Sequence, residues 1–78
     1  MIEKKLRQII TFNSTTDAIA FEKFCKTKEI EGRLIPVPRN ISASCGLCWS
    51  APVEYEENIS LGISEAGLRT AGVYQMFI

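Results

Sequence analysis

Histidine is absent from this sequence of 78 residues, so the chain lacks the side chain that ordinarily changes charge near neutral pH. This absence excludes Ser-His-Asp and Cys-His catalytic arrangements. Cysteine is scarce, with three copies in the whole chain. An odd number of cysteines does not favour a framework of disulfides, and the composition therefore indicates a protein of the reducing cytoplasm.

An excess of charge and a long apolar run are also missing. Nine basic residues balance nine acidic ones, and they form no basic block or stripe. Nucleic acid is therefore not an expected partner, because phosphate neutralisation needs clustered Lys and Arg. No run approaches the ~20 apolar residues of a membrane span, and the N-terminal residues lack the apolar core of a signal peptide. We expect a cytoplasmic protein that does not associate with membranes.

The size of the chain limits the number of domains. With 46% hydrophobic and 23% charged residues, the composition is that of a globular protein. We expect a single domain over residues 1–78, because this length is too short for two cores. A domain of this size buries only roughly 60% of its unfolded surface, so self-association would add useful stability.

Apolar patterning predicts six secondary-structure elements. Strand-like segments lie at both ends of the chain, and two further segments repeat apolar residues three and four positions apart, as helices do. Ser14 and Asp17 have the spacing of a helix N-terminal cap, and Gly67 is placed to end the second helix. The predicted elements are strands over residues 6–12, 33–37, 47–51 and 72–78, a helix over residues 15–28, and a helix with Pro52 in its first turn.

The order of these elements predicts the fold. Strand, helix, strand, strand, helix, strand is the order of the α+β ferredoxin-like βαββαβ two-layer sandwich, in which both helices cover one face of a four-stranded antiparallel sheet. Each helix has one apolar stripe for the core. The first stripe is Ala18, Phe21, Phe24, Cys25 and the stem of Lys28, and the second is Tyr55, Ile59, Gly62, Ile63 and Ala66.

The face of the sheet away from the helices has no predicted cover. The strands place bulky apolar residues on both faces, as with Ile9 beside Ile10 and Met76 beside Phe77. An open face with that much apolar surface predicts a homodimer or a partner protein.

One stretch, residues 36–50, has the composition of a functional site. Two prolines end the preceding strand, since proline cannot donate to a sheet ladder. Gly46 permits a positive φ or the close approach of another group beside the thiol of Cys45. The candidate site residues are Arg39, Ser44, Cys45, Gly46 and Cys48.

Several chemistries remain open for Cys45 and Cys48. Redox pairs of Cys-x-x-Cys spacing usually sit at a helix N-terminus, but here a strand follows, in which positions three apart face opposite sides. A structural zinc site needs four ligands, and this chain offers two close cysteines unless two subunits share the ion. We therefore expect no metal and no cofactor. The remaining readings are a reactive thiolate at Cys45 and a small cysteine that fills a tight corner.

The thiolate reading depends on the neighbours of Cys45. A free thiol, whose pKa is about 8.5, is ionised only to a few per cent at pH 7. Arg39, the hydroxyl group of Ser44 and the amides near Gly46 would lower that pKa if they converged on the sulfur. On residue types alone, the thiolate and the structural cysteine stay equally open.

Motifs along nearly the whole chain resemble the small bacterial selenium/sulfur carrier-like family. The most specific part runs from Pro-x-Pro-Arg, ending at Arg39, to Ser-Cys-Gly, ending at Gly46. The other matching segments are Thr11-Phe12, Ser14-Thr15, Asp17-Ala18, Arg33-Leu-Ile, Ile41-Ser42, Leu47, Glu65-Ala-Gly67 and Val73-Tyr74.

The resemblance implies that Cys45 holds sulfur or selenium as a persulfide or selenosulfide and passes it to an acceptor protein. Arg39 would support this thiol, and Cys48, which is additional to the minimal motif, would either resolve the persulfide or pack. The expected function is transfer of sulfur or selenium between donor and acceptor proteins, by a carrier that is not a stand-alone enzyme and is at most sulfurtransferase-like. The alternative is a non-catalytic interaction or small-ligand-binding module whose pocket is shaped by residues 38–46.

Overall fold

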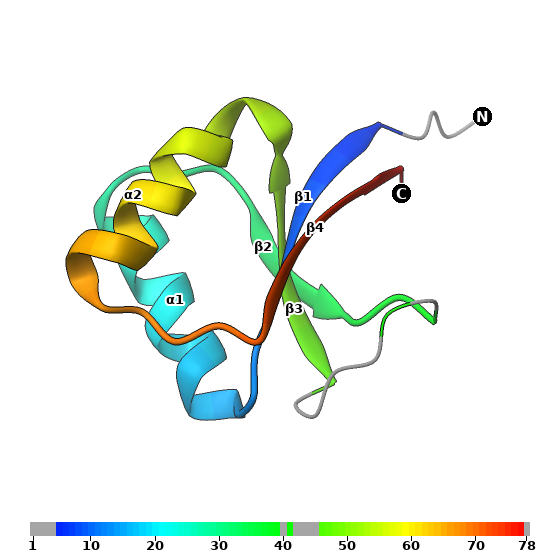
Figure 1. Ribbon diagram of the computed structural model, residues 1–78, viewed down its shortest axis with the longest axis horizontal. Coiled ribbons are helices and arrows are strands. Elements are labelled where there is room, and N and C mark those ends of the chain that lie inside the picture. Colours follow the sequence, from blue (N-terminus) through cyan, green and yellow to red (C-terminus); the bar gives the residue numbers. More distant parts are fainter. Residues whose placement is uncertain (1–4, 40, 42–45, 78) are drawn as a thin grey trace.

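The secondary structure follows the predicted order with small shifts at the ends of elements. A computed structural model describes residues 5–39, 41 and 46–77 (Figure 1). The elements are β1 (Leu6–Thr11), α1 (Thr15–Thr27), β2 (Arg33–Pro36), β3 (Leu47–Pro52), the short 3-10 helix η1 (Val53–Tyr55), α2 (Glu56–Ala66) and β4 (Gly72–Phe77). The last predicted strand residue, Ile78, lies outside the described residues.

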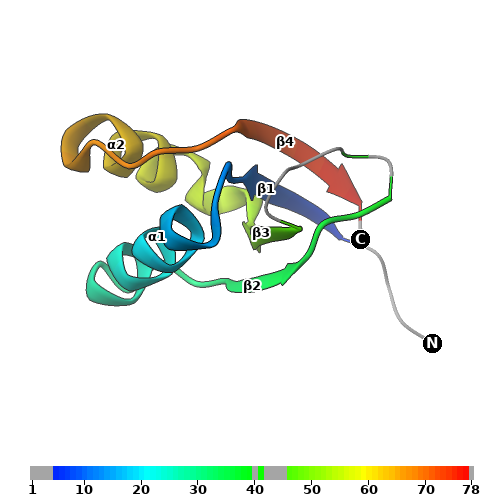
Figure 2. The same ribbon diagram turned by 90° about the horizontal axis from the view of Figure 1, so that it is seen from below.

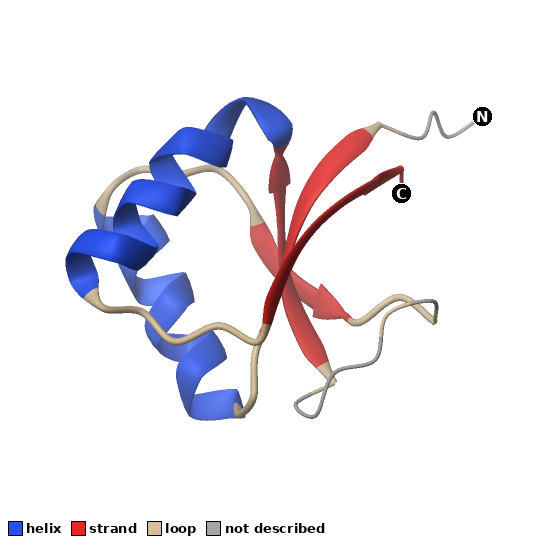
Figure 3. Ribbon diagram, viewed as in Figure 1, coloured by secondary structure: helices blue, strands red, loops and turns tan. Residues whose placement is uncertain are grey.

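The four strands form one antiparallel sheet in the order β2-β3-β1-β4. β1 is central, and its residue Ile10 pairs with Trp49 of β3 on one side and with Val73 of β4 on the other. Both helices lie on the same side of this sheet, as Figures 2 and 3 show. The predicted ferredoxin-like two-layer sandwich is confirmed.

The core lies between the helices and the sheet, and aromatic rings dominate it. The ring of Phe21 on α1 lies 5.3 Å from that of Phe12 and 5.9 Å from that of Trp49, measured between centroids. All three side chains are at most 2% exposed. Gly62 of α2 permits close packing of the two helices, because an added Cβ would clash with the ring of Phe24 on α1.

The helix ends confirm the predicted caps. The side chain of Ser14 accepts a hydrogen bond from the backbone N–H of Asp17 at 3.2 Å, which satisfies one of the donors at the start of α1. Gly67 ends α2 with a φ of 66°, in the left-handed region that favours glycine. Two stripe predictions are wrong, since Lys28 and Ala66, at the C-terminal ends of α1 and α2, are both exposed.

Pro52 is also placed differently from the prediction. It is the last residue of β3, where it pairs with Arg7, instead of lying in the first turn of a helix. Its ψ of 143° is extended, and helical geometry begins only after it, with η1.

The face away from the helices has apolar residues, as predicted, but those at its centre are buried. Its central apolar residue, Ile9, is fully buried, and Thr11 beside it is 1% exposed. Tyr74 contributes to this cover, because its ring lies within 2.9 Å of where a Cβ on Gly72 would stand. The exposed large apolar side chains of the sheet lie along β4, with Tyr74 on the same face as Ile9 and with Val73 and Phe77 on the same face as Ile10.

Candidate functional site

The loop between β2 and β3 is closed at its base by strand pairing. Pro36 pairs with Leu47, and the backbone N–H of Val37 donates to the carbonyl oxygen of Gly46 at 3.1 Å. The described residues that follow β2 leave the sheet on the side away from the helices (Figure 1). The described residues on both flanks of the loop are therefore held by the sheet.

The predicted carrier residue itself is not among the described residues. Cys45 and Ser44 lie outside them, so the structure leaves the prediction for both untested. Arg39 is described, and it occupies a turn in which the N–H of Ile41 donates to the carbonyl oxygen of Pro38 at 3.0 Å. Its side chain is exposed.

Gly46 has the positive φ that sequence reasoning allowed for. Its φ is 78°, a conformation that residues with a side chain rarely adopt. Among the described residues, a Cβ added at this position would meet nothing within 4 Å. The backbone conformation therefore explains glycine at the residue after Cys45.

Cys48 lies within the sheet. It stands on the face away from the helices, opposite Thr11 of β1 and Ile35 of β2, and is 0% exposed. Its Sγ donates to the carbonyl oxygen of Pro36 at 3.9 Å, a weak contact of the kind that thiols make. A resolving role for Cys48 stays a prediction, and it would require β3 to open around a buried sulfur.

Cys25 is a core residue, as its position on the α1 stripe predicted. It is a free cysteine, 0% exposed, and burial raises the pKa of its thiol to about 12. A thiol with that pKa is protonated at neutral pH and is a poor nucleophile.

A metal centre has no support in the described part of the chain. Across residues 5–39, 41 and 46–77, no group of three or more His, Cys, Asp or Glu side chains comes together. None of the described helices is long and apolar enough to cross a membrane.

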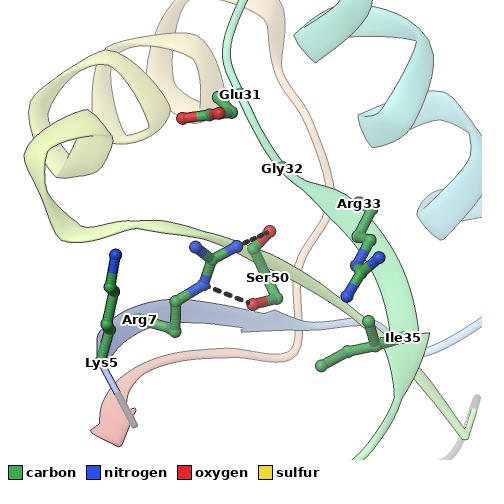
Figure 4. Close-up of a pocket in the computed structure, with 7 residues that line it drawn as sticks. All are labelled: Lys5, Arg7, Glu31, Gly32, Arg33, Ile35 and Ser50. Atoms are coloured by element: carbon green, nitrogen blue, oxygen red, sulfur yellow. Dashed lines mark hydrogen bonds between the residues drawn. The ribbon is translucent and has the colours of Figure 1, made fainter. Parts of the chain in front are cut away.

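The structure also contains a basic pocket that the sequence reasoning missed. It has a volume of about 540 Å³ and lies against β1, β2 and β3 (Figure 4). Arg7 is oriented in it by Ser50, since its Nε donates to Ser50 Oγ at 3.1 Å and its Nη2 donates to the Ser50 carbonyl oxygen at 3.4 Å. The lining residues are Lys5, Arg7, Glu31, Gly32, Arg33, Ile35 and Ser50.

The sequence signal that could have indicated this pocket is the alternation within β1, which puts Arg7 on the opposite face from Gln8 and Ile10. Arg33 reaches the same face because it pairs with Ser50, and paired residues point to the same side of a sheet. That pairing depends on strand register, which the spacing of residues in the chain does not reveal.

Comparison with known proteins adds one match. Residues 7–75 match the model of a family described as Putative Se/S carrier protein-like. Comparisons with curated proteins and with solved structures gave no match.

Proposed function

The chain belongs to the Putative Se/S carrier protein-like family, and we propose that it carries sulfur or selenium on Cys45 between a donor protein and an acceptor protein. The observation that carries the assignment to Cys45 is the burial of the other two cysteines. Cys25 and Cys48 are each 0% exposed, so neither sulfur is accessible to a partner in the folded chain. A carrier needs an accessible sulfur, and Cys45 is the thiol that remains.

The transfer chemistry needs no catalytic base from this chain. The Cys45 thiolate attacks the outer sulfur of a persulfide on the donor, the donor's sulfur–sulfur bond breaks, and the donor leaves as a thiolate. The new persulfide on Cys45 is then attacked at its outer sulfur by an acceptor thiolate, which regenerates Cys45. Selenium in the outer position follows the same exchange. Each step is a displacement without net oxidation, which suits a chain that has no histidine.

The loop flanks support this role for Cys45. Gly46, its neighbour, is tied to Val37 by a backbone hydrogen bond of 3.1 Å, so the residue after the thiol is held against the sheet. Arg39 is exposed in the same loop, where its permanent charge is available to stabilise a thiolate or a persulfide anion. Ser44 is the further polar residue beside the thiol in the proposal.

The donor and acceptor require a docking surface, and β4 is the proposed one. Val73 is 49% exposed, Tyr74 43% and Phe77 65%, on a strand that has a neighbour on one side only. The same edge is the proposed site of homodimerisation, because an unpaired strand edge with apolar side chains readily adds another strand. We place the exchange in the cytoplasm, where reducing conditions keep free thiols reduced.

Mass spectrometry after sulfur loading tests the proposal. We expect incubation with a cysteine desulfurase and free cysteine to add the mass of one sulfur atom to Cys45, with Cys25 and Cys48 unmodified. The variant Cys45→Ser is expected to stay unloaded, whereas Cys48→Ala loads as the unaltered chain does. Loading that survives Cys45→Ser, or no loading of the unaltered chain, would contradict the proposal.

The alternative, a small-ligand-binding module whose pocket is shaped by residues 38–46, is not better supported. The basic pocket is lined by residues outside that loop. Binding of a partner that is unaffected by Cys45→Ser, together with a failure to load sulfur, would favour the alternative.

A further inference from the structure

Three cationic side chains that are far apart in the sequence surround the basic pocket. Lys5 precedes β1, Arg7 belongs to β1 and Arg33 is the first residue of β2. β3 lies between the two strands, and its residue Ser50 pairs with Ile9 on one side and with Arg33 on the other. The side chains of Arg7 and Arg33 therefore project from the same face of the sheet on either side of Ser50, as Figure 4 shows.

The guanidinium group of Arg7 is held in place and still has donors to offer. Its two hydrogen bonds to Ser50 use the Nε–H and one N–H of Nη2. The remaining N–H groups of the guanidinium are available to a ligand. The planar guanidinium can donate two parallel hydrogen bonds to two oxygens of one carboxylate or phosphate group. Ser50 is 4% exposed, and its hydroxyl accepts from Arg7, so its own proton is left to donate into the pocket.

The pocket lacks balancing negative charge. Three cationic residues line it against one acidic residue, Glu31, so the lining has an excess of two positive charges. In Figure 4 the Glu31 carboxylate lies on the other side of the pocket from Arg33. Because the chain as a whole is neutral, this local excess is a property of the fold and not of the composition.

Gly32 allows the β2 edge to lie close to β3 at this point. With a φ of 146°, an added Cβ would stand 2.6 Å from the Ser50 carbonyl oxygen and 2.8 Å from the Trp49 ring. The backbone of the rim is therefore fixed against the strand that orients Arg7. The volume of about 540 Å³ exceeds what one small oxyanion needs and falls in the range of small-molecule pockets.

From these observations we propose that the basic pocket binds a small molecule through a divalent oxyanion head group of the phosphate type, held by Arg7, Arg33 and Lys5 with the Ser50 hydroxyl. The charge of such a group equals the excess charge of the lining. Its oxygens accept from the guanidinium forks, and the rest of the pocket accommodates an organic body. The site is separate from Cys45, so the proposal does not rest on the carrier function.

Titration with inorganic phosphate, followed by amide chemical shifts at fixed ionic strength and pH, tests the proposal. We expect saturable shifts at Arg7, Gly32, Arg33 and Ser50. The variant Arg33→Gln is expected to bind phosphate about tenfold more weakly or worse, because one charge-assisted contact is lost. The Arg33 side chain is exposed, so this variant should fold even if Arg7→Gln does not.

The matched control is Arg69→Gln, which removes an equal charge from an exposed position outside the pocket. We expect phosphate affinity to be unchanged in Arg69→Gln and in Cys45→Ser. Titration with phenyl phosphate distinguishes the two sources of the head group. Tighter binding of phenyl phosphate than of phosphate would support a phosphate ester as the ligand. Equal or weaker binding would assign the site to the free oxyanion and overturn the proposed organic body.

Two results would overturn the proposal. One is the absence of saturable phosphate binding, and the other is an equal loss of affinity in Arg33→Gln and Arg69→Gln, which would mean general charge attraction. Loss of binding in Cys45→Ser would also overturn it, since the site would then belong to the loop. None of these outcomes bears on sulfur loading at Cys45. The proposed oxyanion site and the proposed carrier function can therefore be refuted separately.

Discussion

The backbone N–H of Val37 donates to the carbonyl oxygen of Gly46 at 3.1 Å, one position beyond the last paired residues of β2 and β3. This bond closes the loop that contains Cys45 and fixes the residue next to it. The loop therefore begins and ends where the pairing of β2 with β3 stops. Gly46 is the residue at which the chain re-enters the sheet, with a φ that only glycine adopts easily.

The conformation of Gly46 leads to the first prediction. We expect Gly46→Ala to lower the free energy of unfolding by about 1–2 kcal/mol, because the φ of 78° is costly for a residue with a Cβ. We also expect the rate of Cys45 alkylation to change, since the flank of the loop shifts. Urea denaturation and iodoacetamide labelling measure the two effects.

The control for this change is Gly67→Ala, at a position with a similar φ of 66°. It should cost a similar amount of stability and leave the alkylation rate of Cys45 as it is. Equal alkylation rates in both variants and in the unaltered chain would show that Gly46 does not position the thiol.

The second prediction concerns the pH dependence contributed by Cys25. Burial raises the pKa of this thiol from 9.0 to about 12, so the folded state keeps its proton where the unfolded chain loses it. The contribution to stability is complete below pH 9 and is lost as pH rises from about 9 towards 12. Urea denaturation at pH 7 and pH 10 should show a smaller loss for Cys25→Ala than for the unaltered chain. The same loss in both proteins would contradict the burial of the thiol.

The third prediction concerns the aromatic core. Phe21 packs between Phe12 and Trp49, so Phe21→Ala should lower the free energy of unfolding by about 3–5 kcal/mol. The matched control is Ile19→Ala on the same helix, where the side chain is 52% exposed and the expected change is small. Thermal denaturation followed by circular dichroism compares the two. A similar loss in both variants would be inconsistent with the packing described.

The fourth prediction concerns the β4 edge. If the chain forms a homodimer through β4, Phe77→Lys should shift it to a monomer, because a charge replaces an apolar side chain that is 65% exposed. Leu61→Lys, at a comparably exposed position on α2, should leave the dimer intact. Light scattering after size exclusion gives the mass of each variant. A monomeric unaltered chain would refute the proposed homodimer, and a dimer that survives Phe77→Lys would place its interface away from β4.

Much of the fold could be predicted because local signals are strong in this chain. Ser14 caps α1 and Gly67 ends α2 where the sequence indicated, and the order of elements alone identified the ferredoxin-like arrangement. The errors lie at element ends. Pro52 has a φ that suits both a helix and an extended strand, and only its pairing with Arg7 decides for the strand.

The candidate site was predicted in part. The segment from Arg39 to Cys48 was recognised from residue types, and the positive φ of Gly46 is confirmed. The roles of Arg39, Ser44, Cys45 and Cys48 stay predictions. The basic pocket was missed because Arg7 and Arg33 are separated by α1 in the sequence and meet only through β3.

The sequence by itself determined the order of strands and helices, the family and the small set of residues that can carry sulfur, because these follow from local pattern and residue chemistry. Only the tertiary structure decided that Cys48 is buried and that Lys5, Arg7 and Arg33 share one pocket. Both outcomes depend on strand register and on packing between distant segments. Those contacts form between segments that are far apart in the chain, so no local sequence pattern predicts them.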